Sequence, residues 1–430
     1  MAAARPALSA SSDRGLKVLL LSYVAPVFII NLGNACAYAF QVVLARWLPP
    51  ADVGAFNALL ATVTLLTAPA AVAPLAITRM LPQLEKLVDH GAGATLVART
   101  ALACMAVFVL LAIVTLLASP LTAALFKIDT FTTFAWFASM MAATVIYPVA
   151  GGWFQASGRY IGMALILGGV PILRFVLGLL LVIAAGAGLN GALASATLPC
   201  LITFATALFV VLPGRSAWRT RLPASVVRDT IRFVLPAAAS TTLIYALFNL
   251  DVMLVRAQFD ETASGLYSVA AVIARIPFLL PAALAGIFFA DVMRQQNMTW
   301  HQRRGLLMKN LLIVAAIALG LATGLSVLAA PLLRLIAGEV YTASSSVLQI
   351  SSFAMAGLAL LNIVVTFGMA CDNQKPFAVL FAGVTMFILS TLTATITVAI
   401  SIALLITIWL MLAASLAVVL LAAPRTGCSA

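Results

Sequence analysis

The chain has 430 residues, of which 64% are apolar and only 8% are charged. A soluble globular domain carries about 25% charged residues, so this composition excludes a soluble protein and predicts one embedded in a bilayer. The net charge of +12 would suggest nucleic-acid binding in a soluble protein. In a membrane protein, basic residues instead act as topology signals and as anchors for anionic lipid headgroups, and we expect no nucleic-acid partner.

Long apolar segments predict twelve membrane-spanning helices, because about 20 apolar residues suffice to cross a bilayer. The expected fold class is an all-α polytopic membrane protein. The last two spans need a reversal, since no charge occurs between Lys375 and Arg425. We expect it between Ser390 and Ser401, where hydroxyl groups can satisfy freed backbone groups. The predicted spans are residues 17–44, 54–78, 96–118, 131–156, 160–185, 190–212, 231–256, 265–290, 306–330, 343–370, 376–397 and 401–423.

The distribution of basic residues predicts the orientation. With both termini in the cytoplasm, four basic residues are assigned to the outer side and two to the interior of spans, which leaves 18 of the 24 Lys and Arg at the inner side. This bias is what the positive-inside rule requires. The four predicted outer residues are Arg46, Lys127, Arg256 and Arg334.

The first predicted span carries a polar stripe. Its polar residues follow one another at intervals of three, four and three residues, which places them on one face of a helix. Polar groups in hydrocarbon either bond across a helix interface or face a water-filled cavity, so both readings are open. The residues are Asn31, Asn34, Tyr38 and Gln41.

Arg174 lies within the fifth predicted span, and no carboxylate is evident at its depth. A charge near the bilayer centre costs about 3 kcal/mol or more, so it needs a partner or a wet cavity. A guanidinium can form paired hydrogen bonds to a phosphate. Arg174 is therefore our first candidate for contact with an anionic ligand.

Landmark residues recur 210 or 211 positions later in the chain. The matched pairs are Pro26 and Pro236, Arg46 and Arg256, Gly54 and Gly265, and Phe56 and Tyr267. Such a parallel repeat predicts two six-helix lobes around a central cavity, an arrangement typical of transporters. We expect an N-lobe at 1–212, a cytoplasmic linker at 213–230 and a C-lobe at 231–430.

The seventh span repeats most of the polar stripe at Thr242, Tyr245 and Asn249. Because the stripe occurs in both lobes, we favour a cavity lining over contacts between helices. Arg46 and Arg256, equivalent in the repeat, are expected at the outer mouth. There they would either draw an anionic head group outwards or anchor the helices.

Asp251 and Arg275 lie in the interior of the seventh and eighth predicted spans. Their predicted depths differ by about 7 Å at 1.5 Å per residue, which an extended Arg can reach. One hypothesis is a buried structural pair. The other is that Arg275 binds an anionic ligand while Asp251 carries a coupling proton.

The sequence offers no enzyme site, and we expect no cofactor. His90 and His301 have no Cys or carboxylate neighbours at the spacing of metal ligands, so no metal site is predicted. The chain also lacks a Gly-rich loop ending in Lys and Ser or Thr, the signature of a nucleotide-driven motor. Any uphill transport would draw on an ion gradient.

Three runs resemble a known family. They are ARWLPPADVGAFNALLA, FQASGRYIGMALILGGVPILRFVLGLLLVIAAGAGLNGALASATL and NLDVMLVRAQFDETASGLYSVAAVIARIPFLLPAAL. They look like the polysaccharide-transporter branch of the multidrug/oligosaccharidyl-lipid/polysaccharide exporter superfamily. The resemblance implies a bacterial inner-membrane flippase for undecaprenyl-pyrophosphate-linked oligosaccharides of O-antigen, capsule or exopolysaccharide. It also implies alternating access, and a polysaccharide polymerase and a chain-length regulator are candidate partners.

Two other classes are open. A cation-coupled multidrug exporter of the same superfamily would be expected to carry buried carboxylates in its N-lobe, but the first six predicted spans contain none. A membrane-embedded glycosyl transferase or polymerase would need catalytic carboxylates on a sizeable outer loop. The predicted outer carboxylates are few and lie on short loops, which disfavours an enzyme.

Overall fold

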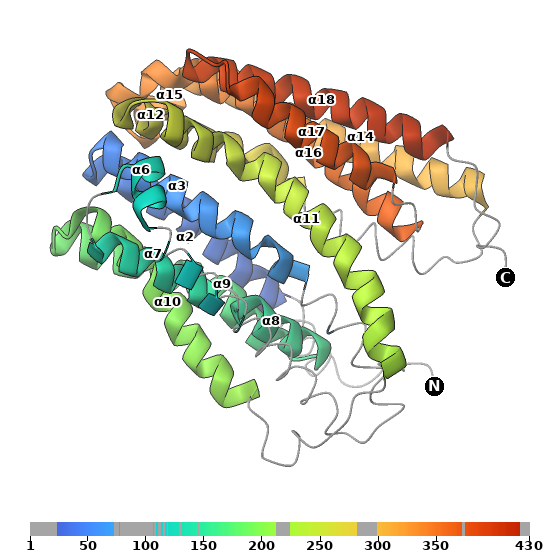
Figure 1. Ribbon diagram of the computed structural model, residues 1–430, viewed down its shortest axis with the longest axis horizontal. Helices are drawn as coiled ribbons and strands as arrows, with labels where there is room; N and C mark the ends of the chain where they lie inside the picture. Colours follow the sequence, from blue (N-terminus) through green and yellow to red (C-terminus); the bar gives the residue numbers. More distant parts are fainter. Residues whose placement is uncertain are drawn as a thin grey trace. The chain divides into compact units, whose positions relative to one another are not determined.

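The computed structural model describes residues 24–72, 119–128, 131–144, 146–211, 224–281, 299–371 and 375–421, with isolated positions between 73 and 118. Within these residues all regular secondary structure is helical (Figure 1). Most of the third predicted span and most of the predicted linker lie outside the described residues. So do His90 and residues 422–430.

Eight of the described helical segments are long and apolar enough to cross a membrane. They are Ala25–Trp47, Pro50–Val72, Tyr160–Ala184, Val234–Gln258, Glu261–Pro281, Trp300–Val327, Glu339–Met369 and Thr397–Leu421. Two shorter apolar helical segments, Gly188–Thr203 and Lys375–Thr391, add to them. Each overlaps a predicted span.

The chain divides into two compact units. Unit 1 comprises 1–43, 70–117 and 131–234, and unit 2 comprises 44–69, 118–130 and 235–430. Unit 2 therefore contains two segments from the first half of the sequence beside most of the second half. The lobe boundaries predicted from the repeat are a separate division and stay a prediction.

Unit 1 is built around α9 and α10. Helix α9 (Tyr160–Gly178) continues into a π-helical turn, η3 (Leu179–Ala184). Both α9 and α7 (Phe131–Thr144) pack against α10 (Gly188–Val211), and α8 (Ile146–Ala156) packs against α9. Helix α2 (Ala25–Trp47) crosses α9 where two glycines meet.

Unit 2 has α16 (Ser345–Ala370) at its centre. Around it pack α12 (Glu261–Ala274), α14 (Trp300–Val327) and α18 (Thr397–Leu421), and α3 (Pro50–Thr67) packs on α12. Two elements lie only partly in this unit, η2 (Ala68–Val72) and α11 (Ala224–Gln258). The remaining elements are α6 (Ser119–Phe126), α15 (Ala329–Ile336), η5 (Glu339–Ser344) and α17 (Lys375–Thr391).

Two features of the helix boundaries bear on the predictions. Helix α17 ends at Thr391 and α18 begins at Thr397, so the chain reverses inside the predicted stretch, and the two helices lie side by side (Figure 1). The short helices α6 and α15 are not predicted as separate elements. Each carries a proline in its first turn, Pro120 and Pro331, where a missing N–H costs no helical hydrogen bond.

Candidate functional site

Arg174 lies on α9 beside α2, within unit 1. Its guanidinium carbon Cζ is 4.5 Å from the centre of the Phe40 ring, and Phe40 is fully buried. A cation over an aromatic face is stabilised by about 2 kcal/mol when the pair is desolvated. Phe40 thus holds the guanidinium close to the helix that carries the predicted polar stripe.

The backbones of α2 and α9 approach closely because glycines face each other. A Cβ atom on Gly33 would lie 2.6 Å from the Gly168 carbonyl oxygen, and one on Gly168 would lie 2.4 Å from the Ile29 carbonyl oxygen. Further along, a Cβ on Gly178 would lie 2.4 Å from the Phe40 ring. This glycine contact determines the position of Arg174 along the axis of α2.

The polar stripe of α2 is partly accessible. Asn31 and Asn34 are exposed, whereas Tyr38 and Gln41 are half-buried. The Asn31 amide donates a 2.8 Å hydrogen bond to the Val27 carbonyl of its own helix. Among the hydrogen bonds of the described residues none reaches its carboxamide oxygen, which can accept from a ligand or water.

The corresponding stripe on α11 lies in unit 2 and is more enclosed. Thr242 and Tyr245 are half-buried, and Asn249 is 2% exposed. Thr242 donates to the Ala238 carbonyl at 2.7 Å, and Asn249 donates to the Tyr245 carbonyl at 2.9 Å. Asn31, Thr242 and Asn249 therefore each donate within their own helix. Whether the two stripes line one cavity stays a prediction.

Asp251 and Arg275 lie together in unit 2. The Arg275 Nη2 atom is 3.8 Å from Asp251 Oδ1, and the Asp251 side chain is almost entirely buried. The Arg275 guanidinium carbon also lies 4.7 Å from the centre of the Phe248 ring. A buried ion pair of this kind offsets part of the cost of removing both charges from water.

A chain of hydroxyl groups extends from Asp251 through the core of unit 2. The Tyr267 hydroxyl donates to Asp251 Oδ2 at 3.2 Å, and Ser401 donates to the Tyr267 hydroxyl at 3.3 Å. Ser351 in turn donates to Ser401 at 3.1 Å. The chain connects α11, α12, α18 and α16, so the state of the ion pair is coupled to the packing of four helices.

Arg46 and Arg256 contact other helices, and both contacts lie in unit 2. The Nε of Arg46 donates to the Ile336 carbonyl at 3.0 Å, and its Nη2 donates to the Leu335 carbonyl. The Nε of Arg256 donates to the Phe126 carbonyl at 2.9 Å. Each arginine thus caps the carboxyl end of a short helix, α15 or α6.

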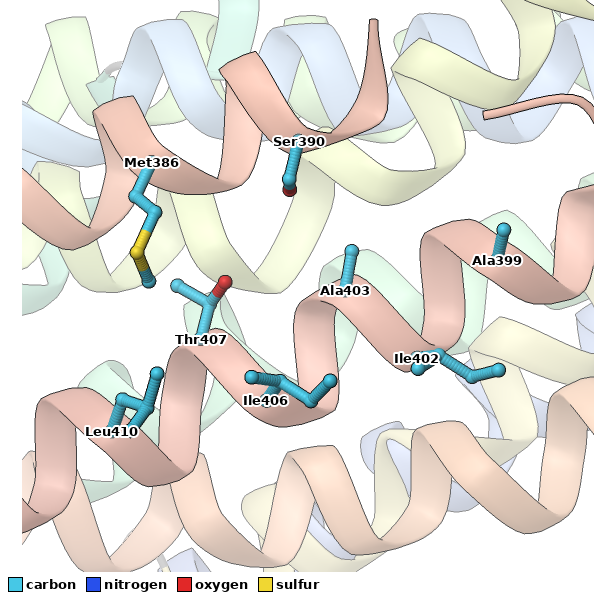
Figure 2. Close-up of a pocket in the computed structure, with 8 residues that line it drawn as sticks. All are labelled: Met386, Ser390, Ala399, Ile402, Ala403, Ile406, Thr407 and Leu410. Atoms are coloured by element: carbon cyan, nitrogen blue, oxygen red, sulfur yellow. The ribbon is translucent and has the colours of Figure 1, made fainter. Parts of the chain in front are cut away.

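A groove of about 340 Å³ runs between α17 and α18 (Figure 2). It contains none of the predicted site residues. Its lining is mostly apolar and suits lipid chains better than a charged head group. The lining residues are Met386, Ser390, Ala399, Ile402, Ala403, Ile406, Thr407 and Leu410.

Sequence comparison identifies the family. The family profile described as "Polysaccharide biosynthesis protein" matches residues 24–289, more than half of the chain. The chain belongs to this family. The match spans Arg174, Asp251 and Arg275, and no curated protein matches the chain.

Solved structures of the MOP superfamily share the fold. The lipid II flippase MurJ in an inward closed conformation has a TM-score of 0.71 at 12% identity, covering 92% of this chain and 87% of that chain. An inward-facing multidrug resistance MATE family transporter has a TM-score of 0.67 at 12% identity, covering 92% and 96%. The eukaryotic MATE transporter AtDTX14 has a TM-score of 0.67 at 15% identity, covering 96% and 97%.

The helical structure of the described residues and the fold shared with these proteins confirm the predicted all-α membrane fold class. The comparisons also confirm the resemblance to the polysaccharide-transporter branch. With eight described helical segments long and apolar enough to cross a membrane, the protein is a multi-pass membrane protein of the polysaccharide biosynthesis family. At these identities the structural similarity concerns the fold and leaves the substrate open.

Several residues of these clusters are absent from the predicted site. Tyr267 enters the sequence prediction only as the repeat mate of Phe56, although it bonds to Asp251. Phe40 and Phe248 carry no polar group, so only their contact with arginines reveals a role. The acceptors of Arg46 and Arg256 are main-chain atoms, which no side-chain pattern marks.

Proposed function

We propose that the protein translocates undecaprenyl-pyrophosphate-linked oligosaccharides from the inner to the outer leaflet of a bacterial inner membrane. The product would feed O-antigen, capsule or exopolysaccharide assembly. Transport proceeds by alternating access, with both termini in the cytoplasm and a polymerase and a chain-length regulator as partners downstream. The polysaccharide biosynthesis family and the fold of a lipid II flippase support this assignment.

The observation that carries the proposal is the position of Arg174. It is a half-buried cation in the middle of a span, held over Phe40 of α2, the helix that carries the predicted polar stripe. A pyrophosphate cannot cross hydrocarbon without replacement of its hydration shell. A guanidinium provides that replacement through its charge and paired hydrogen bonds.

Arg275 is the second cation available to the head group. In this structure it faces Asp251, a carboxylate that an incoming phosphate would have to replace. A pair that is closed in one state and open in another gives the substrate different affinities for the two states. Such a difference is what allows a ligand to shift a conformational equilibrium.

Cation-coupled drug export is the second candidate, because MATE transporters share the fold. That function needs carboxylates able to take up a cation. In the described spans of unit 1 the sequence supplies no Asp or Glu, and Asp251 of unit 2 already faces Arg275. These observations favour the anionic substrate.

A reconstituted transport assay tests the proposal. The purified full chain is placed in liposomes that contain a polyprenyl-pyrophosphate-linked oligosaccharide with a fluorescent sugar label. An impermeant reductant then reports the fraction of label in the outer leaflet. We expect transport by the native protein, a loss of at least about tenfold for Arg174→Ala, and partial recovery for Arg174→Lys, which keeps charge but not paired hydrogen bonds.

The matched control is Arg159→Ala, which removes an exposed arginine next to the first residue of the same helix. It should transport at the native rate. Full transport by Arg174→Ala, at native protein level, would remove Arg174 from the site. Efflux of a cationic dye without movement of the labelled lipid would favour the drug exporter instead.

A further inference from the structure

Arg46 and Arg256 make reciprocal contacts. Arg46 donates through Nε to the carbonyl of residue 336, and Arg256 donates through Nε to the carbonyl of residue 126. The two arginines are 210 residues apart, and so are their two acceptors. Each half of the chain therefore caps the equivalent short helix of the other half, as in an isologous dimer interface.

The acceptor helices are equivalent as well. Helix α6 begins at Ser119 and ends at Phe126, and α15 begins at Ala329 and ends at Ile336, so both ends are displaced by 210 residues. The last carbonyls of a helix lack partners inside it and carry partial negative charge. An arginine side chain donates hydrogen bonds to these carbonyls and places a positive charge beside them. Arg256 also donates through Nη2 to the carbonyl of residue 127 at 3.5 Å.

Residues between these two contacts meet their own repeat copies. A Cβ on Gly54 would lie 2.8 Å from the backbone nitrogen of Gly265, and the Asn57 amide donates to the Ser268 hydroxyl at 3.1 Å. Both pairs are separated by 211 residues. A residue can touch its own copy only near the axis that relates the copies, so α3 and α12 cross on that axis.

These contacts cluster at one end of the helices. Arg46 lies in the last turn of α2 and Arg256 in the last turn of α11, while Pro50 and Glu261 begin α3 and α12. Lys127 adds a 2.6 Å hydrogen bond to the carbonyl of residue 259. The predicted topology places all these residues on the outer side.

We propose that Arg46 and Arg256 are paired latch residues that keep the outer ends of the two halves closed and that release them during transport. The latch rests on the proposed alternating access. Arg46 and Arg256 are positioning residues, because they bind main-chain carbonyls of the protein and not the substrate.

The two latches differ in exposure. Arg256 is 1% exposed and has further contacts with the Ala51 carbonyl and with Glu261, so its removal also disturbs the core. Arg46 is exposed and reaches only across to α15 in the described hydrogen bonds. Arg46→Ala is therefore the cleaner test.

The accessibility of an introduced cysteine measures whether the outer ends of the two halves are closed, and the measurement needs no substrate. In the full chain with its five native cysteines replaced, Asn57→Cys introduces a thiol at a position that is 4% exposed and faces α12. A membrane-impermeant maleimide is added separately to right-side-out and inside-out vesicles. We expect Arg46→Ala to raise the labelling rate of the introduced thiol about tenfold in right-side-out vesicles only, because two hydrogen bonds from a charged group are lost.

Arg334→Ala is the matched control. It removes an exposed arginine of α15 whose partner, Glu339, follows shortly after that helix ends. It should leave labelling unchanged, whereas Arg46→Lys should give an intermediate rate. The Arg46→Ala, Arg256→Ala double variant should exceed Arg46→Ala.

Unchanged labelling in Arg46→Ala would overturn the latch, as would a rise of equal size for Arg334→Ala. A rise confined to inside-out vesicles would overturn it too, because the latch would then close the other side. A rise in labelling without transport of the lipid-linked oligosaccharide would support the latch and reject the proposed substrate.

Discussion

At the scale of single residues, two largely buried charges of unit 2, Asp251 and Arg275, form an ion pair. Asp251 is 0% exposed, yet an arginine and a tyrosine hydroxyl contact its two oxygens. Breaking such a pair by removing one partner leaves a buried charge without compensation. Replacing both partners by apolar groups avoids that penalty.

We therefore expect Asp251→Asn and Arg275→Met, each alone, to lower the free energy of unfolding by about 3 to 5 kcal/mol. An Asp251→Leu, Arg275→Met double variant should recover most of that loss. Thermal unfolding of the purified protein measures this, and the liposome assay measures transport in parallel. We expect the double variant to be stable and inactive, and full transport by it would eliminate both residues from the mechanism.

The sequence predicts the Asp251–Arg275 contact but not the hydrogen bond from Tyr267. The proximity of Asp251 and Arg275 follows from their depths in adjacent spans, which hydropathy reveals. The role of Tyr267 does not, because a buried tyrosine is compatible with packing alone. Only the contact between α11 and α12 brings its hydroxyl to the carboxylate.

At the scale of helices, the crossing of α2 and α9 depends on the absence of side chains. We expect Gly168→Ala to destabilise the protein by about 1 to 3 kcal/mol, because the added methyl group would overlap the Ile29 carbonyl and push the helices apart. Gly169→Ala is the matched control, since a Cβ there meets nothing within 4 Å.

Thermal unfolding compares the two variants. Equal stability of Gly168→Ala and Gly169→Ala would contradict the crossing. Because the crossing also determines the position of Arg174 along α2, Gly168→Ala should reduce transport even at temperatures where the variant stays folded. Gly169→Ala should transport at the native rate.

The existence of the long helices was predictable, because apolar segments of sufficient length are a strong signal. The short helices were not, since eight apolar residues beside a long span look like its continuation. Helix α14 ends at Val327 and α15 begins at Ala329, a break that hydropathy cannot detect. The two missed helices, α6 and α15, supply the acceptors of both arginines.

At the scale of the whole molecule, we expect twelve crossings with both termini in the cytoplasm. Reporter fusions after Lys127 and after Glu339 should report the outer side. A fusion after Arg221, which lies outside the described residues, should report the inner side. An outer signal at Arg221 would contradict the topology and the parallel repeat.

The repeat itself was visible in the spacing of Arg46, Arg256, Gly54 and Gly265. Which copies touch each other was not, because that depends on where the symmetry axis passes through the folded chain. The contact between the two glycines, and the hydrogen bond between the side chains of residues 57 and 268, locate that axis where α3 and α12 cross.

The acceptors of both arginines are main-chain oxygens, which has a consequence for how the sequence can vary. A carbonyl is present whatever side chain the residue carries. Positions 126 and 336 can therefore be substituted by any residue that keeps the helix end in place. The donor side has no such freedom, since it needs a long side chain with a forked cation. Saturation mutagenesis with selection for surface polysaccharide should therefore tolerate many residues at the two acceptor positions and few at Arg46 and Arg256.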